Sequence, residues 1–241
     1  MHKNHDYIPG DFETQKHAHK KEAYYEGMSA IKDLNYSFED LIHYFPCFTG
    51  AQTLTRFLSF YECYKSTLGL AGHIAEVGIY KGASMLFFSK LTQIFEPNSF
   101  TQVHGFDWFQ GNNPSEEESS IVKNSDIESY ERLMKLVKAQ GLDNIAKVHK
   151  LDVTTELDAF FAKHSHLQFK MVFLDAGMYE VVKACLPYFW SRLNKGGYLI
   201  LDQFNFDIAP GETRAIKEYL GEDVQIRTFP WGWMPTAYIV K

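Results

Sequence analysis

From about residue 70 onward, short apolar runs alternate with longer stretches in which apolar residues recur at helical spacing. Short runs are typical of buried strands, and the longer stretches are typical of helices that bury one face. The pattern predicts strands at 74–78, 102–106, 146–151, 171–174 and 198–201. It predicts helices at 83–95, at 126–140, after residue 155, at 179–193 and at 213–220. This alternation indicates βαβ units, and therefore an α/β fold whose parallel sheet is covered by helices on both faces.

The end of the chain departs from this alternation. Two final strands, at 224–229 and 236–240, are separated by a segment that contains Pro and Trp but no helical pattern. A connection this short joins antiparallel neighbours, because a parallel crossover needs a dozen or more residues. We therefore expect the sheet to close with an antiparallel hairpin.

The first residues also differ from the rest. Residues 1–22 are rich in His and Lys, and we expect them to form a flexible arm. Residues 23–68 have a helical pattern that places Leu54, Leu58 and Tyr61 on one face. We interpret 23–68 as an N-terminal helical cap on the α/β domain of residues 69–241.

Composition narrows the class of protein. With 45% hydrophobic residues, a chain of 241 residues can bury a full core. The net charge of −6 gives no basic field for nucleic acid, and we expect no such partner. No apolar run is long enough to span a bilayer, and the polar start of the chain lacks the apolar core of a secretory signal. Cys47, Cys63 and Cys185 form no CxxC pair, which favours free thiols and a cytoplasmic location.

Acidic residues follow the predicted strands with unusual regularity. The five strands end at Glu76, Asp107, Asp152, Asp175 and Asp202. In open α/β sheets, ligands bind at the carboxyl ends of the strands, so these acids would share one edge. One or two of them could be ordinary helix caps, and Asp152 before Thr154 could be only that. For the full set, a binding site is the better interpretation.

The turn after the first strand has the features of a cofactor-binding turn. Glu76 and Gly78 end the strand, and Gly82 and Ser84 lead into the next helix. Glycines let a ligand approach the backbone closely, and the helix N-terminus presents its amides to it. The pattern E-x-G-x-x-x-G resembles the first motif of class I S-adenosylmethionine (SAM) methyltransferases.

Three further segments resemble signatures of the TylF (macrocin O-methyltransferase) family. Gly105-Phe106-Asp107-Trp108-Phe109-Gln110-Gly111 resembles that family's G-F-D-x-F-x-G. Residues 174–180 resemble its L-D-x-D-x-Y-E, and residues 195–204 resemble its G-G-Y-x-x-x-D-D-Y. The resemblance runs from about residue 50 to the end of the chain. It implies a Rossmann-like, seven-stranded methyltransferase sheet, mostly parallel with an antiparallel last strand, and SAM as cofactor.

The resemblance assigns cofactor contacts to residues of the sheet edge. Asp107 would accept hydrogen bonds from the ribose diol, and Asp152 would lie near the adenine amino group. Glu76 and Gly78 would lie beside the methionine part, and Gly82 belongs to the same turn. Ser84 could cap the helix or touch the methionine carboxylate. The set of cofactor-binding residues that we expect is Glu76, Gly78, Gly82, Ser84, Asp107, Trp108, Asp152 and Val153.

Known members of the family methylate sugar hydroxyls, often with a metal ion. The resemblance carries over Asp175 and Asp202 as metal ligands, with Gln203 as a weaker, neutral oxygen ligand. The chain departs from the family twice: Gly177 and Gln203 stand where aspartates are usual. Two carboxylates and a carboxamide can still hold Mg²⁺. The general base stays open, and Asp175 is the candidate if no metal binds.

These observations lead to one function and two alternatives. We expect a SAM-dependent O-methyltransferase that transfers a methyl group, with the help of a divalent metal ion, to a hydroxyl of a sugar or sugar-like acceptor. A surface polysaccharide or a natural-product glycan would be such an acceptor. The first alternative is an NAD-dependent oxidoreductase, although the turn lacks G-x-G-x-x-G because three residues separate Gly78 from Gly82. The second is a SAM-binding protein without turnover. Formation of a homo-oligomer through the cap is left open.

Other polar residues have simpler interpretations. His104 and His149 lie inside strand patterns, and we expect them to be core or sheet residues. The acidic run 116–118 is interpreted as a solvated loop, with the alternative that it covers the ligand.

Overall fold

The computed structural model describes residues 21–118, 121–232 and 234–241. Nearly all of the expected arm, residues 1–22, lies outside these ranges. The chain divides into two compact units, residues 1–56 and 57–241. The second unit therefore begins within the helix that covers Ala51–Ser66.

The described part of the first unit is helical, as expected for the cap. It contains α1 (Lys21–Asp33), α2 (Phe38–His43), the short 3₁₀ helix η2 (Phe45–Cys47) and the start of α3 (Ala51–Ser66). A capping box begins α2: the Ser37 hydroxyl accepts from the Asp40 amide at 3.1 Å, and the Asp40 carboxylate accepts from the Ser37 amide at 3.3 Å. Neither α2 nor η2 buries a residue.

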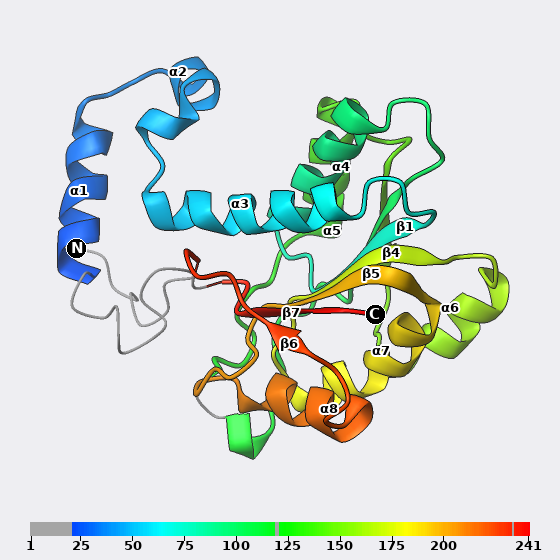
Figure 1. Ribbon diagram of the computed structural model, residues 1–241. Helices are drawn as coiled ribbons and strands as arrows, with labels where there is room; N and C mark the ends of the chain where they lie inside the picture. Colours follow the sequence, from blue (N-terminus) through cyan, green and yellow to red (C-terminus); the bar gives the residue numbers. More distant parts are fainter. Residues whose placement is uncertain (1–20, 119–120, 233) are drawn as a thin grey trace. The chain divides into compact units, whose positions relative to one another are not determined.

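The second unit is built on a seven-stranded sheet (Figure 1). Neighbouring β1, β2, β3, β4 and β5 run parallel, and β7 runs antiparallel to both β5 and β6. The mostly parallel sheet with an antiparallel last strand is thus confirmed. The strand order is β3-β2-β1-β4-β5-β7-β6, with bounds β1 His73–Val77, β2 Val103–Asp107, β3 Ala146–Lys150, β4 Phe169–Leu174, β5 Leu193–Leu201, β6 Ile226–Arg227 and β7 Ala237–Val240.

Helices cover both faces of the sheet, as the alternation predicts (Figure 1). Phe60 of α3 packs against Phe88 of α4 and Phe173 of β4 on one face, with ring centroids 5.1 and 4.9 Å apart. Phe189 of α7 packs against Phe106 of β2 on the other face. The connecting helices are α4 (Ala83–Phe95), η3 (Glu116–Glu118), α5 (Tyr130–Ala139), α6 (Leu157–Lys163), α7 (Tyr179–Arg192) and α8 (Pro210–Leu220).

The structure corrects several expected element boundaries: β4 and α8 begin earlier than predicted, β6 is shorter, and the starts of α5 and β5 differ for reasons that the contacts show. The predicted start of α5 was too early, because the Ser129 side chain accepts from the Arg132 amide and caps the helix before Tyr130. The predicted start of β5 was too late, because the strand includes Gly196 and Gly197. Both glycines pair with the end of the chain: the Gly196 amide donates to the Lys241 carbonyl, and the Lys241 amide donates to the Gly197 carbonyl.

The buried face of α3 was also predicted wrongly. Phe60, Cys63 and Tyr64 are fully buried, whereas the Leu58 side chain is 55% exposed. The aromatic rings of α4 and β4 select the face that carries Phe60, and this contact overrides the local pattern.

One buried ion pair joins three elements of the second unit. The Lys170 ammonium of β4 is fully buried and donates to both carboxylate oxygens of Glu96 at 2.7 and 2.6 Å. The Tyr64 hydroxyl of α3 donates to the same carboxylate at 2.5 Å. Glu96 follows α4 directly, so this carboxylate fastens α3 and the end of α4 to the sheet.

We expect Glu96→Gln to lower the free energy of unfolding by about 3 kcal/mol, because it leaves the Lys170 ammonium buried without a counter-charge. Urea unfolding measures the change. The control is Glu62→Gln, whose carboxylate forms an exposed ion pair with Lys65 at 3.7 Å and should change stability by less than about 1 kcal/mol. Equal effects of the two substitutions would contradict the role given to the buried pair.

A histidine pair lies between β2 and β3, in agreement with the expected core positions. Nδ1 of His104 and Nε2 of His149 are 3.0 Å apart, and the two rings stack. Burial, with a smaller contribution from neighbouring positive groups, lowers the pKa of His104 to about 2 and that of His149 to about 4. Both rings are therefore neutral in the native protein at neutral pH.

This pair predicts loss of stability in mild acid. The unfolded chain takes up protons near pH 6.5, well before the folded pair does, so stability falls as the pH drops below 6.5. Between pH 7 and pH 5 we expect a loss of about 2 kcal/mol for each histidine, measured by urea unfolding. His149→Phe should remove about half of this loss, whereas His166→Gln, at an exposed position, should leave it unchanged. An unaltered pH dependence in His149→Phe would contradict the assignment.

Candidate functional site

The turn after β1 is held in a conformation that only glycine fits easily. Gly78 has φ of +84°, and a Cβ at this position would lie 2.1 Å from the Asp175 carbonyl oxygen at the end of β4. On the other side, the Gly78 amide donates to the Phe106 carbonyl of β2 at 2.9 Å. The chain therefore leaves β1 through a narrow gap between its two neighbouring strands.

Glu76 and Ser84 come together beneath this turn. Glu76 is fully buried on β1, and the Ser84 hydroxyl donates to its Oε1 at 2.5 Å. Ser84 does not cap α4; the cap residue is Gly82, at φ of +80°. Of the two roles considered for Ser84, the structure thus rules out capping, and its hydroxyl is engaged with an acid of the site.

Asp107 fastens the same turn to the end of β2. Its Oδ2 accepts from the amides of Ile79 and Tyr80 at 3.1 and 3.0 Å, and its Oδ1 accepts from the Phe109 amide at 2.7 Å. Tyr80 and Phe109 both have positive φ, and these bonds hold them there. A carboxylate has about four acceptor positions, so Asp107 retains capacity for a further donor. The neighbouring Trp108 indole donates to the Gly111 carbonyl at 2.8 Å.

Asp152 makes a local turn after β3. Its carboxylate accepts from both the amide and the hydroxyl of Thr154, at 2.8 and 2.6 Å. In return, the Glu156 carboxylate accepts from the Asp152 amide at 2.6 Å. These bonds make a turn ahead of α6, whose cap residue is Glu156, so the capping alternative for Asp152 is wrong. Val153, inside this turn, is buried.

Gly177 and Gln203 are sterically matched across the ends of β4 and β5. Gly177 has φ of +61°, and a Cβ there would lie 1.8 Å from Gln203 Oε1. The Gln203 amide group thus occupies the space next to Cα of residue 177. In the part of the chain that the structure describes, no hydrogen-bond donor reaches this buried Oε1. The two residues that depart from the TylF-like signatures are therefore neighbours in space.

Glu212, which the sequence did not single out, is buried beside these residues. It lies in the first turn of α8, and its Oε2 accepts a hydrogen bond from the backbone N–H of Gln203 at 2.6 Å. Its own amide donates to the Gly177 carbonyl at 3.0 Å. Burial and the nearby Asp202 carboxylate raise the pKa of Glu212 well above its usual value. Because acids are common in first helical turns, nothing in the sequence distinguished Glu212.

The acidic run 116–118 is not simply a solvated loop. Glu116 and Glu117 are exposed, but Glu118 is buried, which corrects the expectation for that residue. Its Oε1 accepts from the Tyr179 amide at the start of α7 at 2.6 Å, and its Oε2 accepts from the Ser115 hydroxyl at 2.8 Å. The loop after β2 is thereby anchored to the helix that follows β4.

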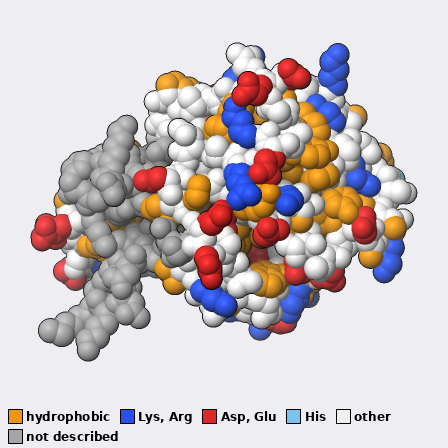
Figure 2. Space-filling model, turned by 90° about the horizontal axis from the view of Figure 1, so that it is seen from below, with side chains coloured by type: hydrophobic (Ala, Val, Ile, Leu, Met, Phe, Trp, Pro, Cys, Tyr) orange, Lys and Arg blue, Asp and Glu red, His pale blue; other side chains and the backbone are white. Residues whose placement is uncertain are grey.

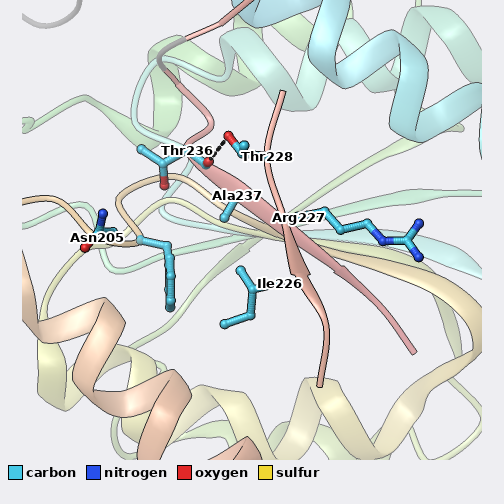
Figure 3. Close-up of a pocket in the computed structure, with 7 residues that line it drawn as sticks. Asn205, Ile226, Arg227, Thr228, Thr236 and Ala237 are labelled. Carbon is cyan, nitrogen blue, oxygen red and sulfur yellow. Dashed lines mark hydrogen bonds between the residues drawn. The ribbon is translucent and has the colours of Figure 1, made fainter. Parts of the chain in front are cut away.

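An open pocket of about 430 Å³ lies beyond the end of β5 (Figure 3). The hydroxyl of Thr228 donates to the Thr236 carbonyl at 2.8 Å on its wall, and the Arg227 side chain points away from the other lining residues (Figure 3). It is lined by Phe204, Asn205, Ile226, Arg227, Thr228, Thr236 and Ala237. Phe204, one of the lining residues, directly follows Gln203 in the chain.

The oxygen-rich end of β4 and β5 fits a hard divalent cation in its chemistry. It offers Asp175, Asp202 and Gln203, and the Gln203 Oε1 is a buried acceptor that no described donor reaches. Among the described residues, no three or more His, Cys, Asp or Glu side chains form a group that could hold a metal ion. A cation here would therefore depend on the amide oxygen.

Two general properties complete the description. In the described ranges, no helix is long and apolar enough to cross a membrane. On the face shown in Figure 2, acidic and basic side chains are intermingled, without a continuous area of one sign.

Comparisons with known proteins identify the class. A family model described as a methyltransferase domain matches residues 75–204, more than half of the chain, and the chain belongs to this family. It has the fold of class I SAM-dependent methyltransferases. This result replaces the alternative of an NAD-dependent oxidoreductase. A comparison with curated proteins gave no match.

Several solved structures share the fold. The crystal structure of CalS11, calicheamicin methyltransferase, has a TM-score of 0.80 at 21% identity, covering 94% of this chain and 93% of that one. An apo structure of CalS11, described as a TDP-rhamnose 3'-O-methyltransferase, has a TM-score of 0.74 at 22% identity, covering 94% and 95%. The O-methyltransferase NovP has a TM-score of 0.66 at 16% identity, covering 77% and 79%.

The gap at Gly78 yields a prediction about the turn. We expect Gly78→Ala to lower the free energy of unfolding by about 3 kcal/mol or more, because a positive φ and a backbone clash are combined. The matched control is Gly141→Ala, where φ is +65° but nothing lies within 4 Å of the added Cβ; it should cost about 1 kcal/mol. Thermal and urea unfolding of both variants would measure this difference, and similar losses would contradict the close approach.

Proposed function

We propose that this protein transfers a methyl group from SAM to a hydroxyl of a sugar or sugar-like acceptor. The observation that carries the proposal is the edge formed by the carboxyl ends of β1, β2, β4 and β5, in a chain of the methyltransferase domain family. The sugar class is supported by the likeness to CalS11, whose structure is described as a TDP-rhamnose 3'-O-methyltransferase. A surface polysaccharide or a natural-product glycan would present such a hydroxyl.

The cofactor would lie against the turn after β1. Gly78 and Gly82 let it approach the backbone, and the buried pair of Glu76 and Ser84 lies beneath this turn. Asp107 would use its remaining acceptor capacity for the ribose diol while it holds the turn closed. Trp108, Asp152 and Val153 would surround the adenosine end, with Asp152 acting partly through the turn that it makes.

Asp175, Asp202 and Gln203 would hold Mg²⁺ at the adjacent strand ends. When bound, this ion would lower the pKa of the acceptor hydroxyl. The chain's own residues orient the acceptor oxygen in line with the sulfonium methyl group, and positioning supplies much of the rate. As the oxygen–carbon bond forms, the sulfur–carbon bond breaks, and the hydroxyl proton leaves. If no metal binds, Asp175 accepts that proton.

A second candidate is a SAM-binding protein without turnover. Gly177 and Gln203 favour it, because both positions lack the carboxylates of the family signature. It predicts cofactor binding with no methyl transfer to any acceptor in a broad panel of sugars and nucleotide sugars.

The first test is isothermal titration with S-adenosylhomocysteine, with and without Mg²⁺. We expect binding that Asp107→Ala weakens at least 10-fold, since the substitution removes a ribose acceptor and releases the turn amides of Ile79 and Tyr80. Asp143→Ala, at an exposed position before β3, should bind as the unaltered protein does. Absence of binding would remove the methyltransferase proposal, and binding without transfer to the acceptor panel would select the second candidate.

A further inference from the structure

Two buried acceptor oxygens lie at the end of β5 without donors from the described residues. They are Gln203 Oε1 and Glu212 Oε1. A buried acceptor without a donor costs free energy, and here the two residues that carry such acceptors are joined by a hydrogen bond from the Gln203 backbone N–H to Glu212 Oε2. Glu212 is fully buried, and its other oxygen, Oε2, accepts a hydrogen bond from the backbone N–H of Gln203 at 2.6 Å.

The position of Glu212 follows from a close helix approach. A Cβ at Gly211 would lie 2.4 Å from the Tyr179 amide nitrogen and 2.0 Å from Glu118 Oε1. Because residue 211 is glycine, the first turn of α8 packs directly against the first turn of α7. This contact brings the Glu212 carboxylate next to the Asp202–Gln203 segment of the sheet edge.

The charge at this edge differs from the family signature in a way that Glu212 can offset. Gln203 removes one carboxylate from the expected ligand set, and Gly177 removes an aspartate that is a candidate general base in the family. The Gln203 side chain fills the space beside Gly177, and Glu212 adds one carboxylate from a different element, α8.

We propose that Glu212 is a ligand of a divalent cation at this edge, together with Asp202 and Gln203. Its Oε1 binds the cation, while its Oε2 keeps the Gln203 backbone in place. Two carboxylates and an amide oxygen suit Mg²⁺ or Mn²⁺, which take oxygen ligands and retain waters. This inference deepens the proposed function and rests on it.

The test measures Mn²⁺ binding in the presence of saturating S-adenosylhomocysteine, by electron paramagnetic resonance of free Mn²⁺. We expect Glu212→Gln to weaken Mn²⁺ at least 10-fold and to leave the S-adenosylhomocysteine affinity unchanged within twofold. The matched control is Glu118→Gln. Glu118 is also a buried glutamate, at the end of η3, but both of its oxygens already accept hydrogen bonds, so the Mn²⁺ affinity should be retained.

The outcomes separate this inference from the function. Unchanged Mn²⁺ affinity in Glu212→Gln overturns the inference and leaves the methyltransferase intact. A protein that binds S-adenosylhomocysteine but no Mn²⁺ overturns the inference and the metal site together. A protein that binds neither overturns the proposed function as well.

A second measurement covers the case in which Glu212→Gln does not fold. Anomalous diffraction from crystals of the unaltered protein with Mn²⁺ locates the ion directly. We expect it at coordination distance from Glu212 Oε1 and Gln203 Oε1. An ion bound elsewhere, or held by Asp202 without Glu212, overturns the inference.

Discussion

The close approach of β1 to β4 at Gly78 is the constraint on which the candidate site depends. The chain must leave β1 where a side chain would meet the Asp175 carbonyl, and it then turns through positive φ at Tyr80 and Gly82. A non-glycine residue at positive φ needs compensation, and the three amides held by Asp107 provide it. The acid after β2 is therefore structural as well as a candidate for cofactor binding.

At the ends of β4 and β5, side-chain size and charge determine the arrangement. At β4 and β5, the absence of a side chain at Gly177 leaves room for the longer Gln203, so steric fit is preserved while charge is lost. Buried polar groups without partners are costly, and two of them, Gln203 Oε1 and Glu212 Oε1, belong to residues joined by a hydrogen bond at this edge. The same packing that brings α8 against α7 through Gly211 places Glu212 at this point. The two glycines therefore provide the space, and Gln203 and Glu212 provide the buried oxygen atoms, at this edge of the sheet.

Much of the fold could be predicted from the sequence, because strand and helix periods are local properties. The helix Ala83–Phe95 and the antiparallel close of the sheet were predicted correctly. Errors arose where a tertiary contact decides the outcome. The buried face of α3 is selected by Phe88 and Phe173, which lie far along the chain from Phe60. Likewise, Gly196 and Gly197 read as a helix stop, but their pairing with Lys241 makes them part of β5.

The site shows the same division more sharply. Acids at strand ends are visible in the sequence, because the topology of a parallel sheet brings those ends to one edge. The roles of Glu118 and Glu212 could not be predicted from the sequence, because helix packing determines their partners. Glu118 accepts from a backbone amide 61 residues away, and Glu212 accepts from the backbone N–H of Gln203 after β5. A buried glutamate and a solvated one look alike in a single sequence. What distinguishes Glu212 is an oxygen without a donor, a property that exists only once α8 has been placed on the sheet.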